Sequence, residues 1–161
     1  MNDSSNRYYA KKTEEGSYAD ITGMYSGVAI LKMDGFLALG KPVNVYTAQW
    51  VDEQEEDFLI PTLDENDNKI VIRENVDIEI TFIVRQKYAS SNIDVQQVHD
   101  SFIDYMTNSD VYLKSAYAGG LSAHCVCLQE YRPTTVKLGR GRNNDYIIGT
   151  ITMHTLEKPH A

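Results

Sequence analysis

The sequence predicts an α+β fold in which a mostly antiparallel β-sheet packs against one main helix. Apolar and polar residues alternate from Val76 to Val84, which is the period of a half-buried strand. An amphipathic helix is predicted at 93–107, and three further strands are predicted at 109–117, 121–131 and 145–157. Strands that fold back over the apolar face of one helix close a small sandwich of two layers.

Length and composition fit a single globular core. The chain has 161 residues, 42% of them hydrophobic and 24% charged, which is typical of folded domains. We expect residues 1–20, which are polar and lack a clear period, to form an N-terminal arm, and residues 21–161 to form one α+β domain. No run approaches the ~20 apolar residues of a membrane span, and residues 1–7 lack a signal-peptide layout, so we expect synthesis in the cytoplasm and no membrane partner.

Strand signals fill the segment from Ile21 to Val51. Two apolar runs, 28–33 and 36–40, flank Asp34-Gly35, a pair that favours a tight turn because glycine accepts positive φ at no steric cost. A third run follows at 42–51. We therefore expect two or three strands in this part of the chain.

A second hairpin is predicted from two short apolar runs, 58–61 and 70–73, around the polar residues 64–68. Charged residues separate these runs from the core strands on both sides. We therefore expect the hairpin to project from the domain.

The helix at 93–107 has a predicted start signal and a clear apolar face. Ser91 is the expected N-cap, and Asp94, three residues later, completes a capping-box arrangement near the positive end of the helix dipole. His99 is expected on the polar side or at the edge of the helix. The apolar stripe consists of Val95, Val98, Phe102 and Met106.

The net charge of −8 is unevenly distributed. Residues 52–67 carry eight acids and no base, whereas residues 131–144 carry four bases and no acid. Two solvated loops would explain this pattern, and so would complementary faces through which copies dock head to tail. An acidic chain without a large cation cluster is a poor candidate for tight nucleic-acid binding. The acidic interface candidates are Asp52, Glu53, Glu55, Glu56, Asp57, Asp64, Glu65 and Asp67.

The basic candidates lie in the glycine-rich segment that contains Lys137, Arg140 and Arg142. This segment does not open a helix and lacks the lysine of a Walker motif, so nucleotide binding is not predicted. A plain hairpin connection and a docking loop for an acidic partner both stay open. Tyrosine is enriched at interfaces because it combines a large contact area with a polar tip. Three tyrosines of the predicted arm are therefore also interface candidates: Tyr8, Tyr9 and Tyr18.

No residue pattern predicts catalysis or a cofactor. His124, Cys125 and Cys127 are zinc-ligand types, but a strand sends His124 to one face and both thiols to the other, and no second ligand pair exists. Two cysteines in this spacing cannot form a disulfide with each other, so we expect both to be reduced and buried. Ser122 lacks the second glycine of a nucleophile elbow. We therefore expect no metal and no enzymatic activity.

The order of elements resembles a known group of proteins. A strand at 76–85, a helix at 93–107 and strands around 111–113, 123–128 and 146–153 follow a β-rich first half with an acidic hairpin. This order resembles the tail terminator and neck proteins of tailed bacteriophages, over roughly residues 40–157. Members of that group are small virion proteins that form rings, commonly hexamers, at the head-proximal end of the tail, where they stop tube growth and join the tail to the head.

The resemblance implies a non-enzymatic virion protein whose partners are copies of itself and other neck or tail proteins. The acidic segment 52–67 would line a channel through which DNA passes without specific binding, and the loop at 137–142 would dock on an acidic neighbour. Many terminators begin with a helix that packs on the sheet, whereas residues 1–50 here predict an arm and strands. That difference leaves a head-completion or connector-ring protein open.

A different class of function is also consistent with the sequence. A small α+β domain can bind a small molecule or a peptide in a pocket between its helix and its sheet. Convergent polar groups near Trp50, Phe102 and Tyr105 would distinguish such a module.

Overall fold

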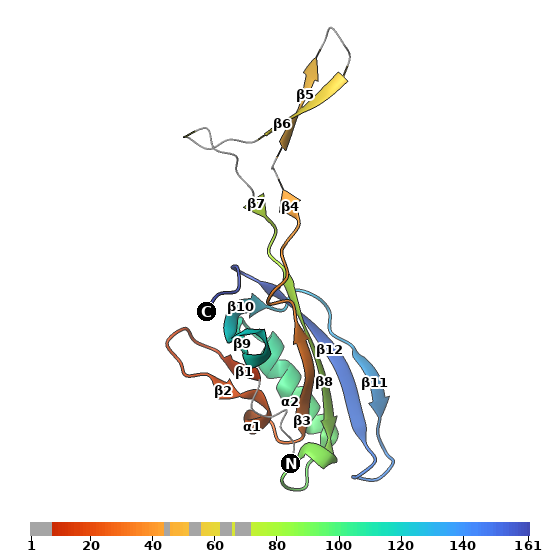
Figure 1. The fold of residues 1–161 in the computed structure, drawn as a ribbon. Coiled ribbons are helices and arrows are strands. Elements are labelled where there is room, and N and C mark those ends of the chain that lie inside the picture. The colour runs from red at the N-terminus through yellow and green to blue at the C-terminus, as the bar shows by residue number, and fades with distance from the viewer. Residues whose placement is uncertain (1–7, 44–45, 52–55, 62–65, 67–71) are drawn as a thin grey trace. The chain divides into compact units, whose positions relative to one another are not determined.

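The computed structural model describes residues 8–43, 46–51, 56–61, 66 and 72–161 (Figure 1). They belong to two compact units. The first comprises the described residues up to Ala38 together with Val76–Ala161, and the second is Leu39–Asn75. The first unit is one eight-stranded antiparallel sheet with a main helix, which confirms the predicted α+β class.

The first unit contains eight strands, two α-helices and two short 3₁₀-helices. The helices are α1 (Ile21–Met24), η2 (Gln86–Tyr88), α2 (Val95–Thr107) and η3 (Ala116–Ala118). The strands are β1 (Tyr8–Lys11), β2 (Ala19–Asp20), β3 (Val28–Asp34), β8 (Asp77–Arg85), β9 (Val111–Ser115), β10 (Leu121–Val126), β11 (Pro133–Lys137) and β12 (Tyr146–Thr155). Their order in the sheet is β2-β1-β9-β10-β12-β8-β3, and β11 pairs with β12 beside β10.

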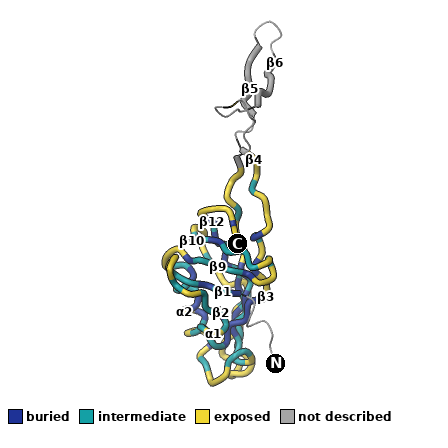
Figure 2. The backbone as a smooth tube through the Cα atoms, turned by 60° about the vertical axis from the view of Figure 1, so that its left-hand side comes forward, coloured by how far each residue is buried: buried dark blue, intermediate teal, exposed yellow. Residues whose placement is uncertain are grey.

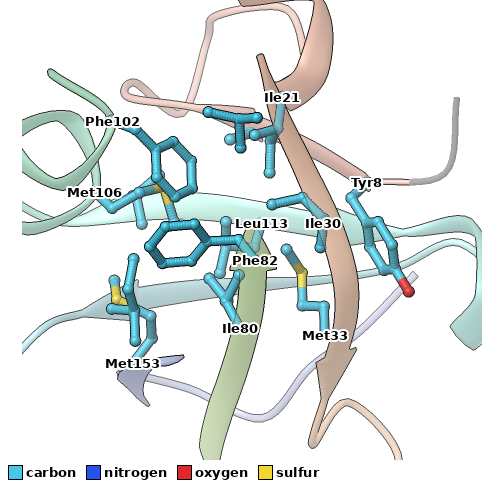
Figure 3. Close-up of a cluster of buried hydrophobic side chains, with 14 of the residues drawn as sticks. Tyr8, Ile21, Ile30, Met33, Ile80, Phe82, Phe102, Met106, Leu113 and Met153 are labelled. Carbon is cyan, nitrogen blue, oxygen red and sulfur yellow. The ribbon is translucent and has the colours of Figure 1, made fainter. Parts of the chain in front are cut away.

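The core lies between the sheet and α2. Along β8, Ile78, Ile80, Phe82 and Val84 are fully buried, while the residues between them are exposed or half-buried. Elsewhere in the first unit, too, buried and half-buried positions lie along the strands and helices, and the connections are mostly exposed (Figure 2). Phe82 meets Phe102 of α2 edge to face, with ring centroids 4.9 Å apart (Figure 3). The predicted alternation from 76 to 84 is thus confirmed, and it assigns one face of β8 to the core.

The start of α2 differs from the prediction in its cap. The carboxylate of Asp94 accepts hydrogen bonds from the backbone N–H groups of Gln96 and Gln97, so Asp94 is the N-cap and the helix begins at Val95. The prediction of Ser91 as the cap is wrong, because three residues separate Ser91 from the helix. His99 is buried, not on the polar side, because it faces Phe82 and Tyr131.

The described part of the predicted N-terminal arm is a strand of the sheet. β1 pairs antiparallel with β9, from Tyr8 opposite Ser115 to Lys11 opposite Tyr112. Tyr8 and Ala10 point into the core, and their alternation is too short to be noticed in the sequence. Residues 8–20 therefore extend the sheet and do not form a separate arm.

Two further strand predictions need correction. Residues 36–40 are not a strand, because β3 pairs with β8 and the chain turns after Asp34, with Gly35 at a φ of 123°. The strand predicted at 121–131 ends at Val126, and the sequence analysis missed β11 as a separate strand. The sequence of β11 begins with Pro133 and two threonines, which is typical of a loop, although proline is tolerated on an edge strand.

The second unit holds two small antiparallel pairs. β4 (Pro42–Val43) pairs with β7 (Ile72–Arg73), and β5 (Tyr46–Val51) pairs with β6 (Glu56–Pro61). The predicted pairing of 58–61 with 70–73 is therefore wrong, since each run pairs with a different strand. No helix in the described parts of the two units is long and apolar enough to cross a membrane.

Candidate interaction surface

The basic segment forms the connection between β11 and β12. Its glycines adopt positive φ, 77° at Gly139 and 92° at Gly141, which side chains rarely allow. Asp145 Oδ1 accepts the backbone N–H of Arg140 at 2.8 Å, and Asn144 donates to the carbonyl of Arg140 at 3.1 Å. These bonds order the backbone of the hairpin connection, while the side chains of Arg140 and Arg142 stay exposed.

The sheet register brings two more cations to the same end of the sheet. Lys137 lies opposite Tyr146 on β12, and Tyr146 lies opposite Arg85 on β8. Cross-strand neighbours in such a row share one face of the sheet. The face is the one away from α2, because the adjacent Val84 is buried in the core. Arg85 is the last residue of β8, and Lys87 lies in η2, which follows directly. The turn after β8 and the β11–β12 connection therefore lie at the same end of the sheet (Figure 1).

We call this surface the basic end; its members are Arg85, Lys87, Lys137, Arg140 and Arg142. Sequence reasoning found the last three but missed Arg85 and Lys87, because about fifty residues of chain separate them from the loop. Only the pairing of β8 with β12 brings them together.

The cations of the basic end have no ion-pair partner among the described residues. Two other cations of the first unit have such a partner: Arg132 pairs with Glu130 at 2.9 Å, and Lys32 with Asp34 at 3.4 Å. Four lysines elsewhere in the described first unit also lack an ion pair, namely Lys11, Lys12, Lys114 and Lys158, but they do not adjoin the basic end. The Arg85 side chain lies against the Tyr146 ring, with 5.9 Å from Cζ to the ring centroid. Its Nε atom is buried and has no hydrogen-bond partner in the described structure. A buried donor without an acceptor is unfavourable.

The acidic candidates belong to the second unit. Glu56 and Asp57 lie in β6, whereas Asp52, Glu53, Glu55, Asp64, Glu65 and Asp67 lie outside the described residues. Eight acids thus fall within residues 52–67 of the second unit, whereas the basic end is a local cluster in the first unit, which also carries acids of its own.

The three tyrosine candidates are not equally accessible. Tyr8 is 8% exposed and packs against Tyr117, with ring centroids 5.4 Å apart, so its side chain belongs to the core. Burial raises the pKa of the Tyr8 phenol. Tyr9 and Tyr18 are half-buried, and Lys11 Nζ lies 4.6 Å from the centroid of the Tyr18 ring. The sequence predicts an interface role for Tyr8, but its side chain is buried in the core and is not available for contact with a partner.

A cavity of about 280 Å³ lies over β9 and β10, lined among others by Lys11, Tyr18, Tyr112 and His124. Its polar groups already have partners. His124 stacks on Tyr112 with centroids 4.1 Å apart, and its Nε2 lies 2.6 Å from Asp110 Oδ2. That hydrogen bond lowers the pKa of the Asp110 carboxyl. The cavity therefore presents little unsatisfied chemistry to a ligand.

The seam between α2 and the sheet, where a binding module would hold its ligand, is filled by side chains. Phe102 is fully buried, and Tyr25 packs edge to face on both Phe102 and Tyr105 at 5.7 Å. The side chain of Trp50 lies outside the described residues. These aromatic rings therefore fill the part of the seam around Phe102.

The cysteines and histidines are used within the fold. Both cysteines are free; burial raises the pKa of the Cys125 thiol to about 12, and the half-buried Cys127 donates to the carbonyl of Gln129. Among the residues that the structure describes, no group of three or more His, Cys, Asp or Glu side chains could hold a metal ion. Each histidine is instead paired with one carboxylate, as in His154–Asp77 at 3.0 Å.

Comparison with known protein families and with curated proteins gives no match to this chain.

Proposed function

We propose that the chain is a non-enzymatic structural protein of a tailed-phage virion, which forms a ring in the head–tail or tail region. The observation that carries this proposal is the basic end, five cations without ion-pair partners in the described chain. Their natural complement is the segment with eight acids and no base. The order of β8, α2, β9, β10 and β12 supports the assignment to the terminator and neck group, with β11 as an additional strand between β10 and β12.

A contact between two different surfaces of identical chains is heterologous, and it closes into a ring when the rotation between copies allows it. Complementary charge fixes the register of such a contact and disfavours wrong partners. Other neck or tail proteins would bind the two faces of the ring. The uncompensated acids would keep DNA that passes through a channel from adhering to its wall.

The test is the solution mass of the purified protein, measured by light scattering at low and moderate salt, followed by negative-stain images of the largest species. We expect closed rings that dissociate as salt rises, because added ions screen exposed charges. Replacing Arg140 and Arg142 by glutamate should abolish the rings and leave the circular dichroism spectrum unchanged.

The matched control carries the same change in charge away from the basic end. Arg132→Glu with Lys158→Glu reverses two exposed cations of the first unit, and this variant should assemble like the wild type. A wild-type protein that stays monomeric at every salt and protein concentration would contradict the proposed ring. Normal assembly of the Arg140/Arg142 variant would remove the docking role of the loop.

A further inference from the structure

We infer that the basic end is the receptor for the acidic segment, residues 52–67, of a second copy of this chain, and that Arg85 is its anchor. The inference rests on the proposed ring and specifies the contact that closes it. It adds Arg85 and Lys87, which lie outside the glycine-rich loop, to the surface.

Arg85 differs from the other cations in its surroundings. Arg140 and Arg142 are exposed on a turn, whereas Arg85 is half-buried on a strand, beside the ring of Tyr146. Its Nε–H lies buried without an acceptor among the described residues. A carboxylate accepts from Nε and one Nη of a guanidinium at the same time, so a rotation of the half-buried Arg85 side chain that exposes Nε would let one aspartate or glutamate satisfy this donor.

The neighbours of Arg85 favour several carboxylates over one isolated ion. Lys137 lies across Tyr146 from Arg85, and Lys87 lies two residues beyond it. Asp145, the acid of the loop, already accepts the backbone N–H of Arg140 with Oδ1. A row of cations on separate elements fits a segment whose acids recur every one or two residues, as they do at 52–57.

The charge of the whole chain favours a second copy over nucleic acid as the partner. Phosphate binding depends on clustered cations, and a chain with a net charge of −8 would repel a polyanion outside the basic end. A second copy instead supplies eight acids without a compensating base, and pairing them reduces the repulsion between subunits.

Zero-length cross-linking tests the contact directly. Rings are assembled from a mixture of isotopically light and heavy protein and treated with a carbodiimide, which joins a carboxylate to a lysine amine as an amide and leaves as a urea that has taken up the elements of water. We expect mass spectrometry to find mixed-isotope peptides that join Lys87 or Lys137 to an acid of residues 52–67. Mixed labels identify a link between two copies.

The outcomes separate this inference from the proposed ring. In one outcome, the protein forms rings in which Lys87 and Lys137 are cross-linked only to acids outside residues 52–67, or only within one chain. That result would overturn the inference and leave the proposed ring unaffected. A protein that never assembles would overturn both.

A charge exchange provides a second, independent readout. Arg85→Gln removes the charge and keeps a hydrogen-bond donor that reaches as far as the Nε position, and we expect it to weaken assembly on the order of tenfold or more, with Lys32→Gln as the unaffected control. Lys87→Glu with Lys137→Glu should also weaken assembly, and adding Glu53→Lys with Glu55→Lys to that chain should restore it. Failure of the restoration, with all variants folded by circular dichroism, counts against the assigned pairing.

Discussion

At the scale of single residues, a polar contact of the core joins helix α2 to Tyr131, in the segment before β11. The Tyr131 hydroxyl lies 2.7 Å from His99 Nε2 on α2, while His99 Nδ1 lies 2.9 Å from Asp100 Oδ1. The Tyr131 ring passes over Gly149 of β12, where a Cβ atom would overlap the hydroxyl. Burial raises the pKa of the Tyr131 phenol.

Gly149→Ala should therefore destabilise the protein by about 1–3 kcal/mol, because the added methyl group displaces Tyr131 and breaks its bond to His99. Urea unfolding followed by circular dichroism measures the loss. In a double-mutant cycle with Tyr131→Ala the two changes should be non-additive, since the same contact is removed twice. Gly23→Ala in α1, where a Cβ atom meets only ordinary contacts, is the control and should change stability little. Equal effects at Gly23 and Gly149 would contradict this explanation.

At the scale of elements, the cap decides where α2 begins. Ser91 and Asp94 are both capping residue types, and both precede the apolar stripe. In the structure, Gln86 holds the turn before the helix: its Nε2 donates to the carbonyl of Ser91, and its Oε1 accepts from the N–H of Ile93. This turn leaves Asp94 at the first position from which a side chain reaches the free N–H groups of the helix.

Asp94→Ala should cost about 0.5–2 kcal/mol, because two backbone donors at the start of α2 lose their acceptor. Ser91→Ala, which keeps the backbone carbonyl used by Gln86, should stay within about 0.5 kcal/mol of the wild type. Thermal unfolding of the two variants side by side checks both values. A larger loss at Ser91 than at Asp94 would restore the cap predicted from the sequence.

Elements with a long apolar period were predictable, and those defined by distant partners were not. β8 and α2 bury a continuous face, so their residues carry the period in the sequence itself. β1 and β11 have four and five residues and become strands only through β9 and β12. The same reason explains why the basic end was predicted only in part. The charges of the loop were visible in the sequence, whereas the position of Arg85 beside Tyr146 depends on the register of β8 with β12.

At the scale of the whole molecule, the second unit is an insertion between two paired strands. β3 ends and β8 begins next to each other, with Asp34 opposite Glu79 and Met33 opposite Ile80. Gly35 also lies close to the backbone of Asp77. The ends of the insertion thus leave and rejoin the first unit where a short turn would join the same strands.

Replacing residues 39–75 by a short Gly/Ser linker should leave the first unit folded, because the core residues that surround Phe82 all lie outside the insertion. The shortened chain should be monomeric at every salt concentration, since it lacks the acidic segment. Light scattering gives the mass, and the thermal unfolding midpoint reports the fold. Loss of the cooperative unfolding transition would show that the first unit requires residues 39–75.

The central place of β12 has a consequence for synthesis. In the order of the described sheet, β12 is the link between the strands β2, β1, β9 and β10 on one side and β8 and β3 on the other. It is also made after all of them, so a nascent chain holds two part-sheets with open edges until the ribosome has released residues 146–155. Open edges invite pairing with other chains. A cell that makes many copies at once therefore gains from completing each chain quickly, and premature termination before Tyr146 would leave a product prone to aggregate.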